Sequence, residues 1–393
     1  MKPFTIAENI YDVGIIDWTT RDFHGYVTPR GVTYNSYLIV DEKNCLIDTV
    51  KKPFTEEFLR NISKVINLAE LDYVVINHVE PDHSGAMPEL AALAPNAVFV
   101  ITQQGKNEAI QHYGDIFNFM VVKEGDTLTL GKNELYFQPL PMLHWPDSMA
   151  TYLKNEQILF SNDAFGQHYC TSKRFDHDLD KDILFYEAQK YFANILWPYA
   201  KLVPRALSKL QALPLKMIAP AHGAIWSDYI EEILMKYSEW GQASKSETLL
   251  IAYETMWGGT EKLARSISHG AATAGVSVRL FRLNTADNSQ IVAELLTAGG
   301  VLFGSSTLNS GMMPNMGSLL VYLKGLQPKG KLAAAFGTYG WNGGAQKGME
   351  EYMHASGFDV QSGFNCKWTP TFELDAAEQF GYEFALKIKE QNR

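Results

Sequence analysis

The chain has 393 residues, of which 46% are hydrophobic and 20% are charged, so it is long enough for about two globular domains with ample cores. Its formal net charge of −10 and the lack of a basic patch with interleaved aromatic residues argue against general nucleic-acid binding. Its cysteines, Cys45, Cys170 and Cys366, are scattered and odd in number, the N-terminus lacks the apolar core of a signal peptide, and no apolar run is long enough to span a membrane. These features predict a soluble cytoplasmic protein without a disulfide framework.

The first part of the chain mixes strands and helices, and its strands come in two batches. Apolar or alternating runs predict strands at residues 10–16, 32–40, 44–50, 71–76, 97–102, 117–123 and 215–220, and at two hairpins that turn at 131–133 and 154–155. Amphipathic runs predict helices at residues 55–66, from residue 84 onward and at 105–112. This order favours two sheets with helices outside them.

Six residues that follow the strand at 71–76 contain two imidazoles and two carboxylates, namely His78, Glu80, Asp82 and His83. The proline and glycine around them predict a tight loop at the carboxyl end of a strand, where α/β folds often hold their chemistry. In such a loop the first two side chains can point one way and the last two the other, which favours two metal ions side by side. The alternative is a polar surface loop with a capping aspartate, but few such loops contain four ligand-type residues in six positions.

Three further ligand candidates stand where predicted strands end. His144 follows residues 140–143, Asp163 follows 158–162, and His222 follows 217–221. Each alone is weak evidence, because a lone histidine is more often a satisfied or surface residue than a ligand. Together they repeat one theme, in which an apolar strand is followed by a histidine or an aspartate at its exit.

The whole pattern resembles the metallo-β-lactamase superfamily, with ligand candidates at His78, Glu80, Asp82, His83, His144, Asp163 and His222. In most of that family the second position is a histidine and the usual metal is zinc, whereas this chain has Glu80. The substitution gives four histidines and three carboxylates. If Asp163 bridges, each metal receives two histidines and one carboxylate of its own, which is ligation that suits non-haem iron.

The resemblance is more specific to the flavodiiron proteins (A-type flavoproteins), because residues 142–149 (MLHWPDSM) and 162–168 (NDAFGQH) look like segments of that family. The resemblance implies that His78, Glu80 and His144 hold one iron. It implies that Asp82, His83 and His222 hold the other, with Asp163 as the bridge. It also implies a fold in which an αββα metallo-β-lactamase-like sandwich is followed by a doubly wound five-stranded parallel flavodoxin-like domain.

Two residues outside the ligand set are candidates for contacts around the metals. His24 lies in a loop that can reach the pocket, and Tyr191 can reach it from a helix. The alternative for each is ordinary packing or a hydrogen bond within the fold. His168 is left out of the ligand set.

The second part of the chain begins after a small, polar segment at residues 241–247, which predicts a linker between domains at 1–246 and 247–393. From there strands and helices alternate regularly. The predicted strands are residues 248–253, 276–281, 301–304, 331–336 and 358–360, and the predicted helices are 261–274, 289–298, 316–326, 344–355 and 376–389. Five parallel strands with crossover helices make a doubly wound domain.

The ligand site of such a sheet lies at the carboxyl ends of its strands, where this chain has three polar or glycine-rich loops. Threonines and glycines before a helix start predict a phosphate cradle, and tryptophan and tyrosine side chains predict stacking on a flat ring. A Walker lysine and a Gly-x-Gly-x-x-Gly pattern are both missing, which disfavours a nucleoside triphosphate or a dinucleotide. The domain looks like flavodoxin, which implies FMN; ordinary turn chemistry is the alternative. The predicted contacts are Thr255, Met256, Trp257, Gly258, Gly259, Thr260, Ser305, Ser306, Thr307, Leu308, Asn309, Gly337, Thr338, Tyr339, Gly340, Trp341, Asn342 and Gly343.

A reduced FMN and a diferrous pair together hold four electrons, the number that converts O2 into two waters, whereas two NO molecules need two electrons to become N2O and water. The resemblance therefore implies an oxidoreductase that removes O2, NO or both. The first alternative is a dizinc hydrolase with an accessory flavodoxin-like part, which Glu80 argues against. The second is an electron carrier or sensor without catalysis, which the complete set of seven ligands argues against.

The resemblance also implies partners. The flavin and the irons lie in separate domains, so a head-to-tail homodimer, alone or as a dimer of dimers, is expected to bring the FMN of one chain to the irons of the other. The chain has no Cys-x-x-Cys pairs and hence no rubredoxin-type centre of its own, and no rubredoxin or flavin-reductase extension is expected after the flavodoxin-like part. Electrons are therefore expected from a separate donor, rubredoxin or a reduced deazaflavin coenzyme.

Overall fold

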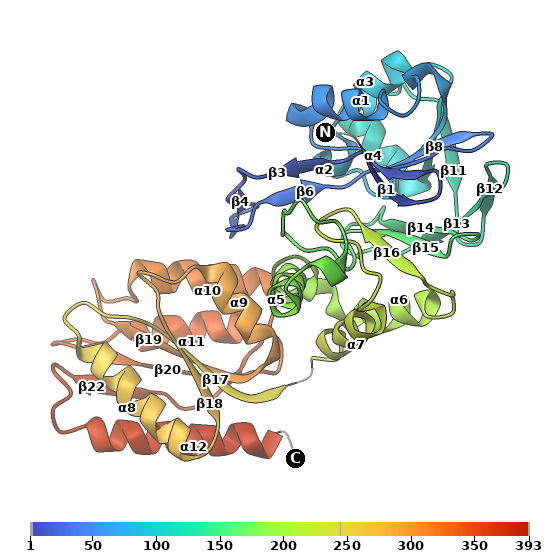
Figure 1. Ribbon diagram of the computed structural model, residues 1–393. Coiled ribbons are helices and arrows are strands. Elements are labelled where there is room, and N and C mark those ends of the chain that lie inside the picture. The colour runs from blue at the N-terminus through green and yellow to red at the C-terminus, as the bar shows by residue number, and fades with distance from the viewer. Residues whose placement is uncertain (1–2, 244, 392–393) are drawn as a thin grey trace. The chain divides into compact units, whose positions relative to one another are not determined.

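The structure is a computed structural model that describes residues 3–243 and 245–391. Met1, Lys2, Asn392 and Arg393 lie outside the described residues, as does Ser244 in the predicted linker. The chain divides into two compact units (Figure 1). The first unit contains Met1–Tyr191 and Lys201–Gly241, and the second contains Phe192–Ala200 and Gln242–Arg393.

The first unit contains a seven-stranded mixed sheet. Its strands, in spatial order, are β1 (Phe4–Ala7), β2 (Ile10–Asp12), β7 (Tyr37–Ile39), β8 (Asn44–Ile47), β9 (Leu71–Val75), β10 (Val98–Thr102) and β11 (Phe119–Val122). The pairs from β1 to β8 are antiparallel, and those from β8 to β11 are parallel. Parallel strands place their carboxyl ends at one edge of a sheet, so the residues that follow β8, β9 and β10 lie on the same side.

A second, five-stranded sheet packs against the first. Its order is β12 (Thr127–Thr129), β13 (Glu134–Pro139), β14 (Met149–Leu153), β15 (Ile158–Asn162) and β16 (Met217–Pro220). Apolar side chains of both sheets form one buried cluster, in which Val75 and Val100 of the first sheet pack with Phe137 and Phe160 of the second. Every residue of β14 and β15 is buried, because these strands are covered on both faces.

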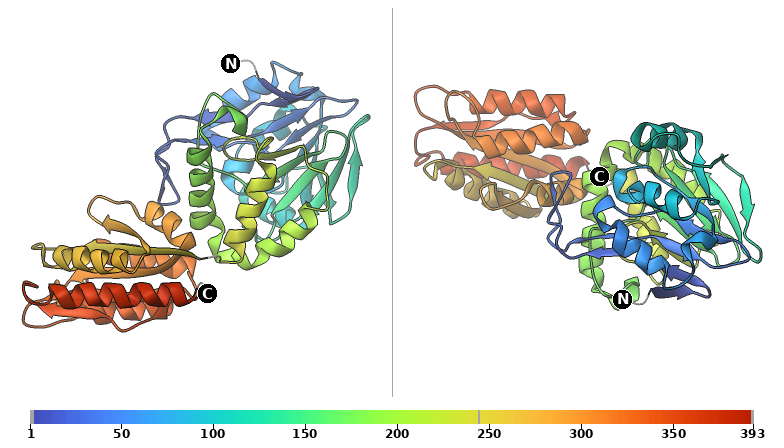
Figure 2. Two further views of the ribbon diagram at one scale, coloured as in Figure 1. Left: turned by 60° about the horizontal axis from the view of Figure 1, so that its bottom comes forward. Right: turned by 90° about the horizontal axis from the view of Figure 1, so that it is seen from above.

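Helices cover the outer faces of this sandwich (Figures 1 and 2). Phe58, Met87 and Ala109 anchor α1 (Thr55–Ile62), α3 (Met87–Leu93) and α4 (Gln103–Tyr113) in a second buried cluster. The other helices of the unit are α2 (Pro81–Ser84), α5 (Lys181–Tyr191), α6 (Val203–Leu210) and α7 (Ile230–Gly241), with short 3-10 turns η1 (Lys52–Phe54), η2 (Leu68–Glu70) and η3 (Asp176–Asp178). Two small sheets pair β3 (Ile15–Asp17) with β6 (Val32–Tyr34) and β4 (Asp22–Phe23) with β5 (Tyr26–Val27).

The second unit is a parallel sheet with helices on both faces (Figure 1). The strand order is β18 (Ser277–Arg282), β17 (Ser246–Glu254), β19 (Ala298–Ser306) and β20 (Leu332–Tyr339), and then β21 (Asp359–Val360) and β22 (Phe364–Lys367), which pair successive parts of β20. All of these pairs are parallel. Two short strands, β21 and β22, therefore occupy the edge position expected for the fifth strand. The sequence analysis predicted β21 but not β22.

Two helices cover one face of this sheet and three the other. On one face α8 (Gly259–Thr273) and α12 (Leu374–Gln391) bury Leu263, Ile267 and Phe384 against the strands. The other face is covered by α9 (Asn288–Thr297), α10 (Pro314–Leu326) and α11 (Ala345–Ala355). The doubly wound architecture predicted from the alternation of strands and helices is confirmed.

Several local predictions were wrong. The helix expected from residue 84 onward is two helices, α2 with Pro81 as its first residue and α3 with Pro88 as its second. Proline suits the first turn of a helix, where its missing N–H would have no partner. The helix predicted at 55–66 ends at Ile62, and the strand predicted at 10–16 is divided between β2 and β3. Asp82 and His83 therefore lie on a helical turn and not in a loop.

The division of the chain differs from a single cut after residue 246. A segment that contains a π-helical turn, η4 (Phe192–Leu196), and the start of η5 (Trp197–Leu202) groups with the second unit. The Asn194 side chain accepts a hydrogen bond from Tyr322 Oη at 2.8 Å and donates one to the Ser289 carbonyl at 3.2 Å. Local helix patterns do not predict such long-range contacts. Among residues 3–243 and 245–391, no helix is long and apolar enough to cross a membrane.

We expect the contact between α8 and α12 to depend on glycine. A Cβ atom at Gly381 would collide with the carbonyl oxygen of Ile267, which is backbone and cannot move aside. Gly381→Ala should therefore destabilise the protein by about 1–3 kcal/mol, as overpacking does. Gly325→Ala, in α10 with open space around the new methyl group, should be neutral or stabilising by up to about 1 kcal/mol. Thermal unfolding followed by circular dichroism compares the two; equal melting temperatures would contradict the expectation.

Candidate metal centre and aromatic pocket

The seven predicted ligands converge at the strand ends of the first unit. His78 and Glu80 lie between β9 and α2, and the helical turn of α2 itself presents Asp82 and His83. The remaining three follow strands of the second sheet, His144 after β13, Asp163 after β15 and His222 after β16. Both sheets of the sandwich therefore contribute to one pocket.

These side chains form two groups, and within each group one ligand atom of every residue lies within 4.8 Å of the others. The groups are His78, Glu80, His144 and Asp163, and Asp82, His83 and His222. In the first group, Nε2 of His78 and Nε2 of His144 each lie 3.2 Å from Oε2 of Glu80. In the second group, Nε2 of His222 lies 3.2 Å from Oδ2 of Asp82, and Nε2 of His83 lies 3.4 Å from Oδ1 of the same carboxylate.

Asp163 lies between the two groups and faces both. Its Oδ2 is 3.5 Å from Nε2 of His144 and 3.7 Å from Nε2 of His78. Its Oδ1 is 3.1 Å from Nε2 of His83 and 3.6 Å from Nε2 of His222. One carboxylate with each oxygen directed at a different pair of histidines has the arrangement of a bridging ligand.

The pocket is buried and rich in negative charge. The most exposed side chains of the set are His144, Glu80 and Asp82, with 13%, 10% and 7% exposed. Although burial lowers the pKa of His83, the Asp82 and Asp163 carboxylates raise it to about 9. Burial likewise opposes ionisation of Asp163, but the charges of His83 and His144 and their hydrogen bonds hold the pKa of this carboxyl well below its usual range. The carboxylates are thus ionised and hold their neighbours protonated.

The residues present fit metal ions on two observations. Within the described part of the chain, Oδ1 of Asp82 and Oδ2 of Asp163 are buried without a hydrogen-bond partner. A buried, unpartnered carboxylate oxygen is costly unless a cation compensates its charge. The donor set of imidazole nitrogens and carboxylate oxygens suits a divalent transition metal, which would displace the protons that the histidines otherwise hold.

Hydrogen bonds from the outer ring nitrogens fix two of the histidines. Nδ1 of His78 lies 2.9 and 3.1 Å from the two carboxylate oxygens of Asp147, and Nδ1 of His222 lies 2.6 Å from the Thr33 carbonyl oxygen. Carboxylate and carbonyl oxygens accept only, so these ring nitrogens donate. The Nε2 atoms are therefore free to act as ligands inside the pocket.

A polar network below the pocket holds the loop that contains His78. The Asp48 carboxylate accepts hydrogen bonds from the backbone and side-chain nitrogens of Asn77 at 2.7 and 3.0 Å, and from Nδ2 of Asn162 at 3.3 Å. Sequence reasoning missed Asp48 and Asp147. Asp48 follows β8 directly, so the same rule of an acidic residue at a strand exit would have found it.

The two predicted outer residues both touch ligands. His24, at the turn between β4 and β5, places Nε2 2.8 Å from Oε1 of Glu80. Tyr191 donates a hydrogen bond from its hydroxyl to Oδ1 of Asp163 at 2.8 Å. His168, which was left out of the ligand set, belongs to neither group. It is buried against the rings of Tyr26 and Tyr191, and burial together with the neighbouring His222 holds its pKa well below the usual range.

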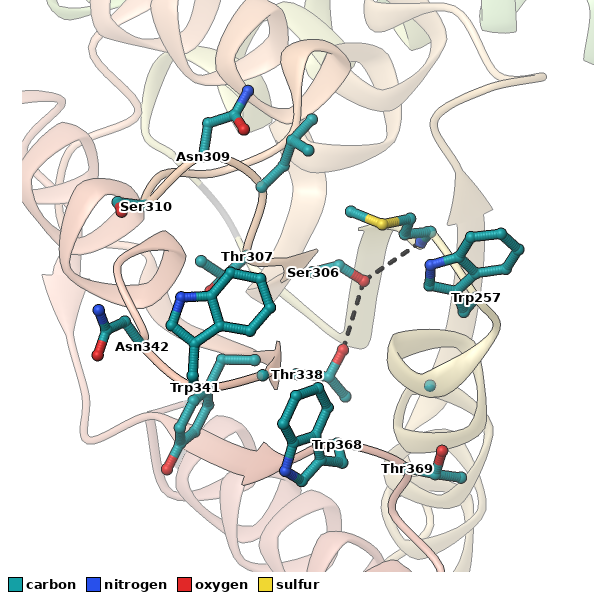
Figure 3. A pocket seen from close by; sticks show the side chains of 15 residues that line it. Trp257, Ser306, Thr307, Asn309, Ser310, Thr338, Trp341, Asn342, Trp368 and Thr369 are labelled. Atoms are coloured by element: carbon teal, nitrogen blue, oxygen red, sulfur yellow. Dashed lines mark hydrogen bonds between the residues drawn. The ribbon is translucent and has the colours of Figure 1, made fainter.

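A separate pocket of about 450 Å³ opens at the carboxyl ends of the strands in the second unit (Figure 3). Trp257 lies on one side of it, and Trp341 and Trp368 lie on the other. It is lined by Met256, Trp257, Gly259, Ser306, Thr307, Leu308, Asn309, Ser310, Thr338, Tyr339, Gly340, Trp341, Asn342, Trp368 and Thr369. Such a cavity, apolar at its walls and polar at its base, suits a flat aromatic ring with a polar chain.

Most, but not all, of the predicted contacts line this pocket. Those that do not are Thr255, Gly258, Thr260, Ser305, Gly337 and Gly343, which lie behind or beside the lining. Ser310, Trp368 and Thr369 line it but were not predicted. The last two follow β22, and because that strand was missed, the loop after it was missed too.

Hydroxyl groups and a helix start meet at the base of the pocket. Oγ1 of Thr260 lies 3.0 Å from both Oγ of Ser306 and Oγ1 of Thr338. The Met256 amide donates to the same Ser306 hydroxyl at 3.2 Å (Figure 3). Gly258, with a φ of 82°, immediately precedes α8 in a left-handed conformation that favours glycine. The first turn of α8 has N–H groups without partners inside the helix, as the start of any helix does, and such groups suit an anion.

Two family models match successive parts of the chain. Residues 32–223 match the family model of the ODP family beta lactamase, and residues 251–385 match that of flavodoxin. A nitric oxide reductase from Moorella thermoacetica is 43% identical over 98% of this chain and 99% of its own. An anaerobic nitric oxide reductase flavorubredoxin from Klebsiella pneumoniae is 41% identical over 97% of this chain and 81% of its own.

Solved structures resemble the whole chain as well. The rubredoxin oxygen:oxidoreductase from Desulfovibrio gigas has a TM-score of 0.95 and 36% identity, with 99% of each chain covered. The flavodiiron protein from Giardia intestinalis has a TM-score of 0.92 and 34% identity, with 100% of this chain and 98% of its own covered. With two matched domain models and relatives of this identity along its entire length, the chain belongs to the flavodiiron protein family.

Proposed function

We propose that the protein reduces O2 to water, NO to N2O, or both, at a non-haem di-iron site, with electrons that pass through FMN. The observation that carries this proposal is the donor set of the metal pocket, four histidines and three carboxylates with Asp163 between the two groups. The names of the relatives support it, since they include nitric oxide reductases and a rubredoxin oxygen:oxidoreductase.

In this proposal His78, Glu80 and His144 hold one iron, Asp82, His83 and His222 hold the other, and Asp163 bridges them. The distances within each group support the assignment. Two histidines and a carboxylate leave open positions at each metal, as in non-haem iron sites that react with small gases. Three carboxylates offset the added charge when iron is oxidised, which a zinc site does not need.

FMN is proposed to bind in the aromatic pocket, with its ring between the indoles of Trp257 and Trp341 and its phosphate at the start of α8. When bound, FMN and the iron pair supply the electrons and the open coordination sites for gas reduction. The chain itself supplies binding and orientation. The Ser306 and Thr338 hydroxyls, which Thr260 holds from behind, and the helix N–H groups hold the anion, and the indoles cover the faces of the ring.

His24 and Tyr191 are proposed to act around the metals. The Tyr191 hydroxyl donates its one proton to Oδ1 of Asp163 and so orients that bridging carboxylate. His24 closes the pocket over Glu80, and its hydrogen bond to that carboxylate raises the pKa of its imidazole. Both side chains therefore hold a proton close to where oxygen atoms from the substrate must be protonated.

A head-to-tail homodimer, alone or paired into a dimer of dimers, is the proposed assembly, and rubredoxin or a reduced deazaflavin coenzyme is the proposed donor. Transfer from a flavin in one unit to metals in another requires a short distance, which a second chain can provide. A reducing cytoplasmic location is proposed as well, since the three cysteines are all free and buried.

Two other functions are less well supported. A dizinc hydrolase would leave the flavin-sized pocket without a role and would not require Glu80 in place of histidine. A simple electron carrier would leave the seven converging ligands without a role. The relatives are reductases by name and not hydrolases, which agrees with this order of preference.

Turnover with each gas tests the proposal. Iron- and FMN-loaded protein, reduced anaerobically by a rubredoxin system, should consume O2, NO or both, and metal analysis should find about two irons per chain. Asp163→Asn should lower gas consumption at least about 100-fold while FMN is still reduced, because the bridge between the groups is lost. Asp182→Asn, at an exposed position on α5, is the matched control and should be unchanged. If loaded wild-type protein consumes neither O2 nor NO, the proposal is refuted.

The base of the aromatic pocket predicts how FMN is held. Thr260→Val removes the hydroxyl that contacts Ser306 and Thr338, leaving both with one partner fewer. We expect FMN to bind about tenfold more weakly, equivalent to one lost hydrogen bond of about 1.4 kcal/mol. Thr273→Val, at the exposed end of the same helix, should leave FMN affinity unchanged. Titration of FMN fluorescence measures both, and equal affinities would show that the Thr260 hydroxyl has no part in binding.

Dilution tests the proposed assembly. If electrons cross between chains, specific gas reduction should fall as the protein is diluted through its dimer–monomer transition, while reduction of bound FMN by the donor persists. Sedimentation velocity at the same concentrations supplies the fraction of dimer. Constant specific activity in protein that is shown to be monomeric would contradict transfer between chains.

A further inference from the structure

The backbone around His222 is buried and irregular. Residues 220–223 lie where the chain leaves β16, and after Pro220 they belong to no helix or strand. Buried carbonyl groups without partners are costly, so each of these four residues needs a hydrogen-bond donor from elsewhere in the fold. The donors that the fold provides here decide how firmly His222 is held.

Asn35, which follows β6, supplies donors to three of these four carbonyl groups. Its backbone amide donates to the Ala221 carbonyl at 2.7 Å. Its side-chain nitrogen Nδ2 donates to the Pro220 and Gly223 carbonyls, each at 2.9 Å. Both hydrogens of the side-chain amide are therefore used, one on each side of His222.

A buried arginine fixes the direction in which the Asn35 amide points. Nη2 of Arg174 donates to Oδ1 of Asn35 at 3.0 Å and forms a short ion pair with Oδ2 of Asp12. All three side chains are buried. Because a guanidinium group can only donate, Oδ1 must face Arg174, and the NH2 group of the amide must face the two carbonyls. A cationic donor on Oδ1 also strengthens the N–H donors of the same amide, since linked hydrogen bonds polarise one another.

The same segment of chain also holds the ring of His222. The Thr33 carbonyl oxygen accepts from Nδ1 of His222 at 2.6 Å, and the Thr33 hydroxyl accepts from the Gly223 amide at 2.6 Å. Nε2 is thereby directed at Oδ2 of Asp82, 3.2 Å away. None of these hydrogen bonds involves His78, Glu80 or His144, so the network acts on the second ligand group.

We propose that Asn35 and Arg174 are positioning residues for the ligand His222, because they fix residues 220–223 and so aim Nε2 at the second metal. Asp12 balances the charge of Arg174, which makes a buried cation tolerable at this place. This inference rests on the proposed metal function of His222. A network that acts on one ligand should affect one of the two metal ions, whereas a general loss of folding would affect both.

Titration of the metal-free protein with Co²⁺ tests the proposal, because the visible absorption of Co²⁺ reports its ligands and calorimetry counts the ions bound. Wild-type protein should bind two ions per chain. Asn35→Ala should bind one of them about 10- to 100-fold more weakly, the usual effect of losing a partner behind a metal ligand, and the other with unchanged affinity. The absorption bands of the weakened ion should change as well, since His222 is no longer held in one position.

A second variant addresses the orientation of the amide and serves if Asn35→Ala does not fold. Asp12→Asn combined with Arg174→Met removes the buried ion pair as a unit, which a fold often tolerates, and keeps an oxygen for the Gly14 amide that Asp12 binds at 3.0 Å. The Asn35 amide remains but is free to turn. The same Co²⁺ ion should therefore be weakened, by a smaller factor than in Asn35→Ala.

The matched control removes a surface ion pair of the same unit. Lys209→Met combined with Glu124→Gln, whose side chains are 2.7 Å apart, should leave both Co²⁺ affinities unchanged. Thermal unfolding of each metal-free variant shows whether it is folded. Two unchanged affinities, or an equal loss of both, in a folded network variant would overturn the positioning role while the proposed function stands. Selective loss of one ion, together with iron-loaded wild-type protein that consumes neither O2 nor NO, would support the positioning role and refute the proposed function.

Discussion

The first unit depends on the compensation of three carboxylates buried in one pocket. Glu80, Asp82 and Asp163 stand within reach of one another's histidines, and two of their oxygens have no hydrogen-bond donor among the described residues. Burial of such charge costs several kcal/mol unless cations neutralise it. The protonated histidines compensate part of this charge, and a pair of metal ions compensates it more completely. The requirement for positive charge at this point explains why the ligands are held so firmly.

The fold meets that requirement by delivering ligands from both sheets. Strand ends of the seven-stranded sheet supply His78 and, through α2, the next ligands, while strand ends of the five-stranded sheet supply His144, Asp163 and His222. Because the proposed ligands lie within a few residues of hydrogen-bonded strand ends or on α2, the sheets restrict their backbone positions. Hydrogen bonds behind the rings then fix the side chains, so that the pocket is organised before a metal arrives.

Much of this arrangement was visible in the sequence, because strand exits are local features. An apolar run followed by His144, Asp163 or His222 places a ligand candidate at a sheet edge without any knowledge of the partner strands. His78 and Asp147 could not be paired in this way. Their hydrogen bond depends on how two loops that lie 69 residues apart in the chain pack together. The same limit explains why Trp368 was not predicted as a contact. This residue follows β22, a short and polar strand that is stabilised by pairing with β20.

The metal pocket is buried, whereas the aromatic pocket is open to solvent. This difference agrees with the proposed roles, gas chemistry at the first and electron entry at the second. The metal pocket is almost closed, so small gases can enter while bulk water is excluded, and its charges act in a medium of low polarity. The aromatic pocket is open, with Trp257 92% and Trp341 80% exposed. Indoles at the surface leave the edge of a bound flavin accessible to other proteins, as a group that receives electrons from a separate donor requires. Closure at one site and exposure at the other therefore separate electron entry from gas chemistry.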